Sequence, residues 1–268
     1  MPLRACAAAV LFATLCSAAY GAPPRLRAMQ PPLAIGGDRH LLWIGAHPDD
    51  EVLVAPLLES ACVRNGARCS ILVMTRGEGG DCLLPGGCSP DLLTVRSGEM
   101  IRAAARFRAS LIQWELPDVM QSVGAAWDEE ATVERLTTIF RESAPSLVIT
   151  FDPMHGSSCH PAHRESGRLV LAAVARLGAA APRVLLVETT IARNGSDFTF
   201  TPALSDPNLQ RFDAASFWQA LPDDAAIHAS QFTPEQIASL ERQPSEQRVI
   251  WLLPAERSAA AAYRLRCE

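Results

Sequence analysis

The strongest constraint on the fold is a regular alternation of short apolar runs with segments of helical periodicity. The apolar runs occupy residues 40–46, 69–75, 110–115, 147–151 and 184–188. Between them, apolar residues recur every three or four positions, as in helices with one buried face; the first two helices are expected over residues 50–64 and 91–106. Strands that are apolar on both faces and alternate with helices are typical of a mainly parallel sheet with helices on both faces.

The same α/β pattern continues to about residue 191. Two more helical patterns follow the third and fourth strands, through Val133, Leu136 and Phe140 and through Leu169, Ala173 and Leu177. Beyond residue 191 the sequence predicts a hairpin at Asn194-Gly195, a helical stretch over 213–220 and a further strand over 247–253. Because neither an internal repeat nor a low-complexity linker interrupts the pattern, we expect a single Rossmann-like α/β domain over residues 22–268.

Composition and charge exclude two broad classes of protein. Apolar residues make up 49% and charged residues 20% of the 268 residues. This apolar content is enough for a buried core and is not typical of a disordered chain. With 24 basic and 29 acidic residues the net charge is −5, which argues against the cationic face that nucleic acids require. We therefore expect a globular protein that does not bind nucleic acid.

Residues 1–21 have the pattern of a secretory signal peptide. Arg4 gives a positive start, an apolar run extends over 5–15, and Ala19 and Gly21 are small residues before a cleavage point. The run is shorter than the roughly 20 apolar residues of a membrane span, and Leu15 is not the small residue expected before a lipidated cysteine. The pattern predicts a periplasmic or secreted protein without a membrane span after cleavage; a disordered N-terminus is the alternative.

Export would place the cysteines in an oxidising compartment, where an even number favours disulfides. Of the eight cysteines, those at positions 62, 69, 82, 88, 159 and 267 remain after signal cleavage. Closeness in sequence favours Cys62–Cys69 and Cys82–Cys88 as pairs. Cys159–Cys267 is then the third pair, which would join the C-terminal tail to a histidine-rich loop. The alternatives are that some cysteines are free thiols or that Cys159 is a zinc ligand.

A histidine and three acidic residues follow the first predicted strand, in the run Gly-Ala-His-Pro-Asp-Asp-Glu over residues 45–51. Open α/β sheets bind ligands at the carboxyl ends of their strands. His47 and Asp50 can point the same way if the chain enters a helix at Pro48, because proline suits the first helical turn. Asp49 then points elsewhere, so the two adjacent acids can have different roles.

A second histidine cluster follows the fourth predicted strand, with His160 and His163 in the run His-Pro-Ala-His. If the first and fourth strands are neighbours, the two clusters converge. Two histidines, one aspartate and a water would make a catalytic zinc site, in which the metal lowers the pKa of the water to about 7. The alternative interpretation is that the acids only cap a helix and that the histidines are ordinary surface or core residues.

In their order along the chain, these motifs resemble those of the PIG-L/LmbE-type N-acetylglucosaminyl deacetylases. The matching stretches are Ala-His-Pro-Asp-Asp-Glu over 46–51, Thr-Arg-Gly-Glu over 75–78, Arg-Ser-Gly-Glu over 96–99, His-Pro-Ala-His over 160–163 and His-Ala-Ser-Gln over 228–231. The resemblance covers roughly residues 40–235 in the family's order, and the ordered set is more specific than any one motif.

The resemblance implies a zinc hydrolase that removes acetyl from an amino sugar. By position, His47, Asp50 and His163 would hold zinc, and Asp49 would be the general base that takes a proton from the attacking water. His160 would lie near the oxyanion or donate a proton to the leaving amine. The resemblance also implies substrate binding by two residues of the second helix, Arg96, which would contact the sugar, and Glu99, which would brace the site.

Two positions depart from the family pattern. The family commonly has an acid between the two histidines, where this chain has Ala162, and some members have a tyrosine at the position of Ser158. Loss of the acid would lower the pKa of His160 and weaken its role as a proton donor. Because the tyrosine is absent, His155 or Asp152 would have to supply the oxyanion contact that the tyrosine gives.

Plainer roles remain open for three residues of the matching motifs. Arg96 can be an exposed helix residue, Glu99 can pair with a neighbouring arginine on the helix surface, and His228 can be a packing or capping residue.

The leading hypothesis is therefore an exported zinc-dependent deacetylase of an N-acetylated amino sugar or sugar conjugate. One alternative is a zinc amidase that acts on a different N-acyl substrate. The other is a non-catalytic sugar-binding protein with a decayed site, for which Ala162 and Ser158 are the warning. Iron, manganese or cobalt can replace zinc on such ligands, because histidine and aspartate accept several divalent metals.

Overall fold

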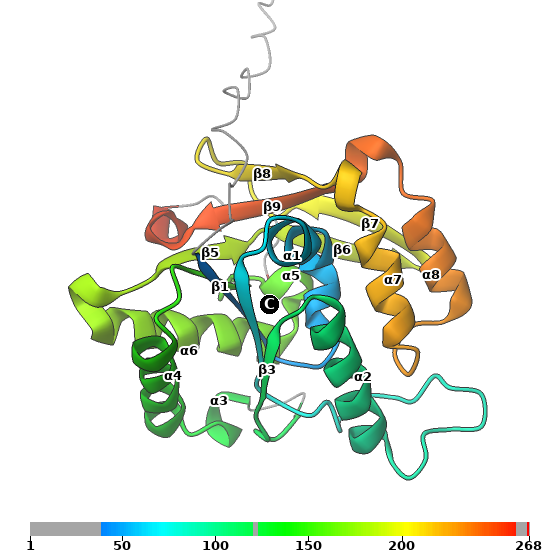
Figure 1. The fold of residues 1–268 in the computed structure, drawn as a ribbon, viewed down its shortest axis with the longest axis horizontal. Coiled ribbons are helices and arrows are strands. Elements are labelled where there is room, and N and C mark those ends of the chain that lie inside the picture. Colours follow the sequence, from blue (N-terminus) through cyan, green and yellow to red (C-terminus); the bar gives the residue numbers. More distant parts are fainter. Residues whose placement is uncertain (1–38, 120–122, 261–266, 268) are drawn as a thin grey trace, which may run out of the picture.

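A seven-stranded sheet forms the centre of the protein (Figure 1). The computed structural model describes residues 39–119, 123–260 and 267; the expected signal peptide, residues 1–21, lies outside them. The strands of the sheet are β1 His40–Gly45, β2 Arg68–Val73, β3 Ser110–Gln113, β4 Leu147–Phe151, β5 Arg183–Val187, β8 Gln210–Asp213 and β9 Val249–Pro254. None of the helices in this part of the chain is long and apolar enough to cross a bilayer.

The strand order is β3-β2-β1-β4-β5-β9-β8. The first five strands pair in parallel, whereas β9 runs antiparallel to β5 and β8. The chain moves outward from β1 to β3 and then returns to place β4 on the other side of β1. This reversal opens a crevice beyond the carboxyl ends of β1 and β4, where sheets of this kind bind ligands. The predicted mainly parallel α/β sheet is confirmed, and so is the contact between the first and fourth strands.

Helices cover both faces of the sheet (Figure 1). One face carries η1 Asp50–Val54, α1 Ala55–Leu58, η2 Glu59–Arg64, α2 Leu92–Arg106, α7 Ala220–Ile227 and α8 Pro234–Glu241, and the other carries α3 Val123–Ala126, α4 Glu129–Ser143 and α6 Pro161–Leu177. Alternate residues of β1 supply both cores: Leu41 and Trp43 pack on the first face, and Leu42 and Ile44 on the second. This explains why the strand is apolar at every position.

The remaining elements are short. They are α5 Gly156–Cys159, the 3-10 turns η3 Gly178–Ala180, η4 Ala215–Phe217, η5 Ser245–Gln247 and η6 Ala255–Ala260, and the strands β6 Thr189–Asn194 and β7 Asp197–Pro202. Strands β6 and β7 form a separate two-stranded antiparallel hairpin. The hairpin predicted at Asn194-Gly195 is thus confirmed, as is the added strand near residues 247–253.

Two expectations about helices are wrong in detail. The helix predicted over residues 50–64 is helical over that whole span, but it is a 3-10 turn, one α-turn and a π-helix in succession. The helical stretch predicted over 213–220 contains the last residue of β8, the 3-10 turn η4 and a further turn, and α7 begins only at Ala220. Periodicity also missed β8 and α8, which are short elements stabilised by long-range packing.

Three disulfides join the pairs expected from the sequence, Cys62–Cys69, Cys82–Cys88 and Cys159–Cys267. The alternative of a zinc ligand at Cys159 is therefore wrong. The third bond closes a separation of 108 residues and attaches position 267 directly to α5, just before His160. This bond anchors the histidine loop, whereas the other two close separations of 7 and 6 residues.

We expect the double variant Cys159→Ser/Cys267→Ser to lose about 2–5 kcal/mol of stability, because a long loop is no longer closed in the unfolded chain. Thermal and denaturant unfolding would measure the loss. The matched control is Cys82→Ser/Cys88→Ser, which opens a much shorter loop and should cost less. An equal loss in the two variants would contradict the anchoring role of the Cys159–Cys267 bond.

Candidate metal centre

The turn after β1 is held by the carboxylate of Asp50. Its Oδ2 accepts hydrogen bonds from the backbone N–H groups of Ala46 and His47, at 2.7 and 2.8 Å. Gly45 is required here, because a Cβ at this position would lie 2.9 Å from the Cβ of Asp50. With Oδ2 committed to the backbone, Oδ1 is left to face the histidines.

Three side-chain atoms from the two predicted clusters converge beyond the carboxyl ends of β1 and β4. Asp50 Oδ1 lies 3.0 Å from His163 Nε2, and His47 Nδ1 lies 3.2 Å from His163 Nε2 and 3.7 Å from Asp50 Oδ1. Ligand atoms in a tetrahedral zinc site are about 3.3 Å apart, given bonds of about 2.0–2.2 Å. The triangle therefore fits one divalent metal ion. We refer to His47, Asp50 and His163 as the triad.

Hydrogen bonds on the far ring nitrogens orient both triad histidines. His163 Nδ1 donates to the carbonyl of Gly156 at 2.9 Å. The lone pair of its Nε2 therefore faces the other two triad residues. The ring of His163 also stacks on Phe151, with centroids 4.1 Å apart. His47 Nε2 lies 3.2 Å from Asp118 Oδ1, which leaves Nδ1 toward the triad. Such outer partners are typical of metal-binding histidines.

Asp118 was not among the residues singled out from the sequence. It follows β3 and lies on the loop that returns toward the triad, where its Oδ2 accepts from the Gly79 N–H at 3.0 Å. Its signal was present but weak: it is an acid just beyond the carboxyl end of a predicted strand. Although burial opposes the imidazolium, hydrogen bonds to Asp118 and Asp50 raise the pKa of His47 to about 10. A metal ion on Nδ1 would replace the proton that faces Asp50, while the Nε2–H would remain bonded to Asp118.

Asp49 sits beside the triad in a strained backbone conformation, with φ of 107°. Its Oδ1 accepts from the Arg96 guanidinium at 3.0 Å, and the same Arg96 group donates to the carbonyl of Pro48. Burial raises the pKa of Asp49, Arg96 acts against this rise and Asp50 adds to it. A raised pKa suits a carboxylate that must accept a proton, and backbone strain is concentrated at functional sites.

Arg96 is itself buried and acts through Asp49. Besides Pro48 and Asp49 it donates to the carbonyl of Gly77 at 2.9 Å. Gly77 has a φ of 72°, and a Cβ there would lie 2.5 Å from the guanidinium. Arg96 is 3% exposed and its polar contacts hold the turn that carries Asp49, whereas its contact with a sugar stays a prediction.

Glu51 and His228 brace Asp49 from the other side. Glu51 Oε2 accepts from the Asp49 N–H at 3.2 Å, and Glu51 Oε1 contacts His228 Nε2 at 2.5 Å. Although burial disfavours the charged ring, Glu51 raises the pKa of His228 to about 9. Asp224 completes this buried cluster. Burial and the charge of Glu51 raise the pKa of Asp224 well above the usual range. His228 therefore belongs to a supporting network that sequence reasoning treated as packing.

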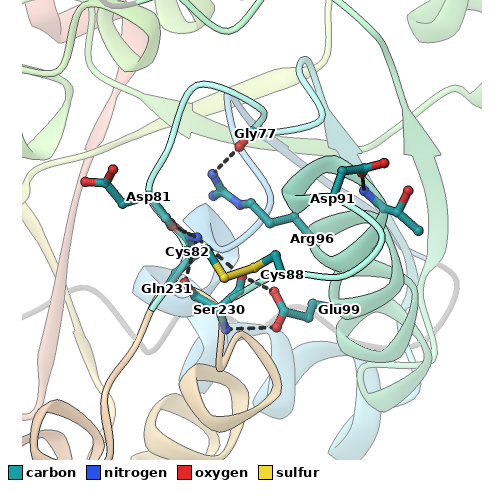
Figure 2. The surroundings of a disulfide bond; sticks show 10 residues. Gly77, Asp81, Cys82, Cys88, Asp91, Arg96, Glu99, Ser230 and Gln231 are labelled. Atoms are coloured by element: carbon teal, nitrogen blue, oxygen red, sulfur yellow. Dashed lines mark hydrogen bonds between the residues drawn. A yellow bond between two sulfur atoms is a disulfide. The ribbon is translucent and has the colours of Figure 1, made fainter. Parts of the chain in front are cut away.

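Glu99 braces a loop and is not available to a ligand (Figure 2). Its two carboxylate oxygens accept from the N–H and hydroxyl of Ser230 at 2.9 and 2.6 Å, and it is 2% exposed. The neighbouring Gln231 donates to the carbonyl of Asp81 at 2.8 Å, beside the Cys82–Cys88 disulfide (Figure 2). These contacts occupy both oxygens of Glu99 and are those of a brace, which is the role that the resemblance implies for it.

His160 faces the triad from the start of α6. Its ring centroid lies 4.7 Å from those of both His47 and His163, and its Nδ1 accepts from the Ala162 N–H at 3.3 Å. Burial, with added repulsion from the two neighbouring rings, lowers its pKa to about 4. The neutral ring therefore carries its proton on Nε2. The lowered pKa agrees with the expectation drawn from Ala162, although burial is its largest cause.

His155 and Asp152 do not replace the missing tyrosine. Both are fully buried, and His155 pairs with Glu188 at 2.7 Å and accepts from the Ser157 N–H at 2.9 Å. They shape the loop from beneath and do not reach a ligand at the triad. The backbone of this loop has a positive φ at three positions, 50° at Gly156, 62° at Ser157 and 61° at Cys159, and it is strained at the two that are not glycine.

With this geometry established, comparison with known proteins gives the family. A sequence profile of PIG-L, described as GlcNAc-PI de-N-acetylase, matches residues 42–174, a span that contains all three triad residues together with Asp49 and His160. The chain belongs to the PIG-L/LmbE family of metal-dependent N-deacetylases.

Two curated relatives of the PIG-L/LmbE family carry the name 1D-myo-inositol 2-acetamido-2-deoxy-alpha-D-glucopyranoside deacetylase. The protein from Thermobifida fusca is 25% identical over 241 residues, which cover 72% of this chain and 84% of the relative. The protein from Mycobacterium leprae is 32% identical over 161 residues, which cover 53% of this chain and 52% of the relative. The match thus spans about half the length of the second relative.

Solved structures share the fold at low identity. An N,N'-diacetylchitobiose deacetylase from Pyrococcus horikoshii is 18% identical, with a TM-score of 0.58 over 76% of this chain and 74% of that one. The 4-carboxy-2-hydroxymuconate hydratase GalB from Pseudomonas putida is 16% identical, with a TM-score of 0.58 over 76% and 83%. Because proteins named for different reactions share this fold, the fold does not decide the activity.

We expect His47→Ala and His163→Ala each to lose bound metal, because two ligand atoms cannot hold a zinc ion against water. Metal content per chain after dialysis would measure this. His40→Ala is the matched control, since His40 lies at the opposite end of β1 and bonds to Ser143 and Ser70. Metal near one per chain in either triad variant would overturn the ligand set.

We also expect Asp118→Asn to keep the metal but to weaken its affinity roughly 10–100-fold, the usual cost of losing an outer carboxylate. Competition with a chelator of known affinity would measure the change. Glu115→Gln is the control, because Glu115 is exposed on the same loop and contacts only Arg76 among the described residues. An affinity equal to that of the control would show that Asp118 does not tune the site.

Proposed function

We propose that this protein is an exported, zinc-dependent hydrolase that removes the acetyl group from an N-acetylglucosamine-containing molecule. The observation that carries the proposal is the triad of Nδ1, Nε2 and Oδ1 atoms at metal-binding separations, with the strained Asp49 carboxylate beside it. Membership of the PIG-L/LmbE family and the names of the curated relatives support the class of substrate.

In this proposal His47, Asp50 and His163 hold the metal. A bound Zn²⁺ supplies Lewis acidity, which polarises the amide carbonyl and lowers the pKa of a water molecule. Asp49 takes the proton of the attacking water, since its carboxylate is kept in place by Arg96 and by the backbone contact to Glu51. The backbone strain at Asp49 and its raised pKa favour the role of general base over that of an additional metal ligand.

His160 stabilises the developing oxyanion in this proposal. Its Nδ1 already accepts from the Ala162 N–H, so its Nε2–H is the free donor, and donors aimed at a developing negative charge are worth several kcal/mol. Because its pKa is lowered to about 4, the ring acts near neutral pH as a hydrogen-bond donor. The proton that Asp49 accepted passes to the nitrogen as the C–N bond breaks, which gives acetate and a free amine.

Two further features support the proposal. The residues that the chemistry needs are all present and braced, which argues against a non-catalytic sugar-binding protein with a decayed site. Three disulfides join the six cysteines outside the expected signal peptide, and disulfides persist in oxidising compartments; they support export to the periplasm or the medium. Iron, manganese or cobalt are alternatives to zinc on the same ligands.

We expect Asp49→Asn to retain metal and to lose roughly 10²–10⁴-fold in turnover, the usual value of a general base. Acetate release from N-acetylglucosamine conjugates, measured together with metal content and before and after chelation, tests this. The control is Asp81→Asn, because the Asp81 side chain is exposed and only its carbonyl is bonded. Normal turnover of Asp49→Asn would remove Asp49 from its role.

A further inference from the structure

An apolar cavity of about 150 Å³ adjoins the triad. Asp49, Asp50 and His163 line it where it meets the candidate metal centre. Its outer wall is built from aromatic and aliphatic side chains of the β6–β7 hairpin, of α7 and of the segment that includes α8. These outer residues are Ile191, Phe198, Phe200, Leu221, Phe232 and Leu240.

Ser157 and Ser158 of α5 also line the cavity on the side of the triad, whereas the outer wall is apolar and disfavours a sugar ring. A monosaccharide carries hydroxyl groups around its ring, and a hydroxyl buried without a hydrogen-bond partner costs about 1–3 kcal/mol. The six outer residues offer no side-chain donor or acceptor, whereas an alkyl group would gain from each methylene that it buries there.

Other polar groups of the site lie outside this cavity. His160, Asp118 and Glu78 are absent from its lining, and Glu78 and Asp118 are joined through the Asp118 N–H at 3.1 Å. A substrate whose carbonyl is at the triad can therefore direct its sugar toward the polar loops after β2 and β3. The group attached to the other side of the carbonyl carbon then enters the apolar cavity.

We propose that this cavity is an acyl-chain pocket and that the protein prefers N-acyl amino sugars whose acyl group is longer than acetyl. This rests on the function proposed above and specifies the substrate class of the same site. Water adds its oxygen to the carbonyl carbon, the C–N bond breaks, the chain leaves as a carboxylate and the sugar nitrogen takes the proton. No other reactant is needed.

The volume sets the length of the chain. An apolar cavity of about 150 Å³ in another protein holds one benzene molecule, so about six carbon atoms fit. An acetyl group would leave most of this space empty. It would therefore gain little of the free energy that a longer chain gains by covering the apolar wall. We therefore expect the preference to reach its maximum at chains of about six carbons.

The outer wall of the pocket lies outside the segment that matches the PIG-L profile. All six outer residues lie after residue 174, where the match to the PIG-L profile ends. The hairpin packs on α8 partly through its backbone, since the Phe198 N–H donates to Ser239 and the Phe198 carbonyl accepts from Gln243. The wall is thus a fixed part of the fold.

The test measures kcat/KM of the zinc-loaded protein on glucosamine with N-acetyl, N-butanoyl, N-hexanoyl and N-decanoyl groups. We expect a rise of about fourfold per added methylene up to about six carbons and a fall for decanoyl. A rate that declines steadily from acetyl would overturn the pocket and leave the proposed deacetylase intact. If none of the four amides is hydrolysed, both proposals fail.

Two substitutions at Leu240 change the pocket without touching the catalytic groups. Leu240→Phe should shift the preference toward acetyl by filling space, and Leu240→Ala should shift it toward longer chains. Leu136→Ala, in the core on the opposite face of the sheet, controls for lost stability and should leave the order of the four substrates unchanged. An unchanged order in both Leu240 variants, with melting temperatures showing that they are folded, would overturn the pocket.

Binding gives a readout that does not depend on turnover. With Asp49→Asn, calorimetry should show N-hexanoyl glucosamine binding at least tenfold more tightly than N-acetyl glucosamine, and Leu240→Phe in the same background should abolish the difference. Equal affinity for the two sugars in Asp49→Asn would contradict the pocket.

Discussion

The carboxylate of Asp50 connects the fold to the chemistry of this protein. One of its oxygens fixes the backbone as the chain leaves β1, and the other faces His163, which arrives from α6. Burial opposes a charge here, but the two histidines hold the pKa of Asp50 well below its usual value. A single ionised group therefore shapes the turn and presents a ligand atom, so the turn and the candidate metal centre form together.

The strained backbone conformation of Asp49 is a consequence of that turn, and side chains from several elements hold it in place. The left-handed conformation costs about 1–3 kcal/mol for a residue other than glycine. Arg96 from α2 holds the side chain and the preceding carbonyl, while Glu51, backed by His228 after α7, accepts from the backbone N–H. Long-range hydrogen bonds thus maintain a conformation that local sequence preferences would not choose, and they aim a carboxylate at the triad without making it a ligand.

The two parts of the chain contribute differently to function. The part that matches the family, residues 42–174, carries the triad, the proposed base and the proposed oxyanion donor. The later part adds the antiparallel strands β8 and β9, the β6–β7 hairpin and α7 and α8, which provide both the support from His228 and the apolar wall beside the triad. Since proteins named as a hydratase and a deacetylase share the fold, the fold alone does not decide the reaction.

The sequence by itself determined the parallel sheet, the pairing of the cysteines and the two histidine clusters. These follow from local patterns: apolar runs and helical spacing report burial, and parallel strands bring their carboxyl ends to one edge. The tertiary structure alone decided that Arg96 is buried and holds Asp49, that Ser230 is the partner of Glu99, that Asp118 orients His47, and that an apolar cavity adjoins the triad. Those facts depend on contacts between residues tens to hundreds of positions apart, which no local pattern encodes because the partner of a buried polar group is set by packing.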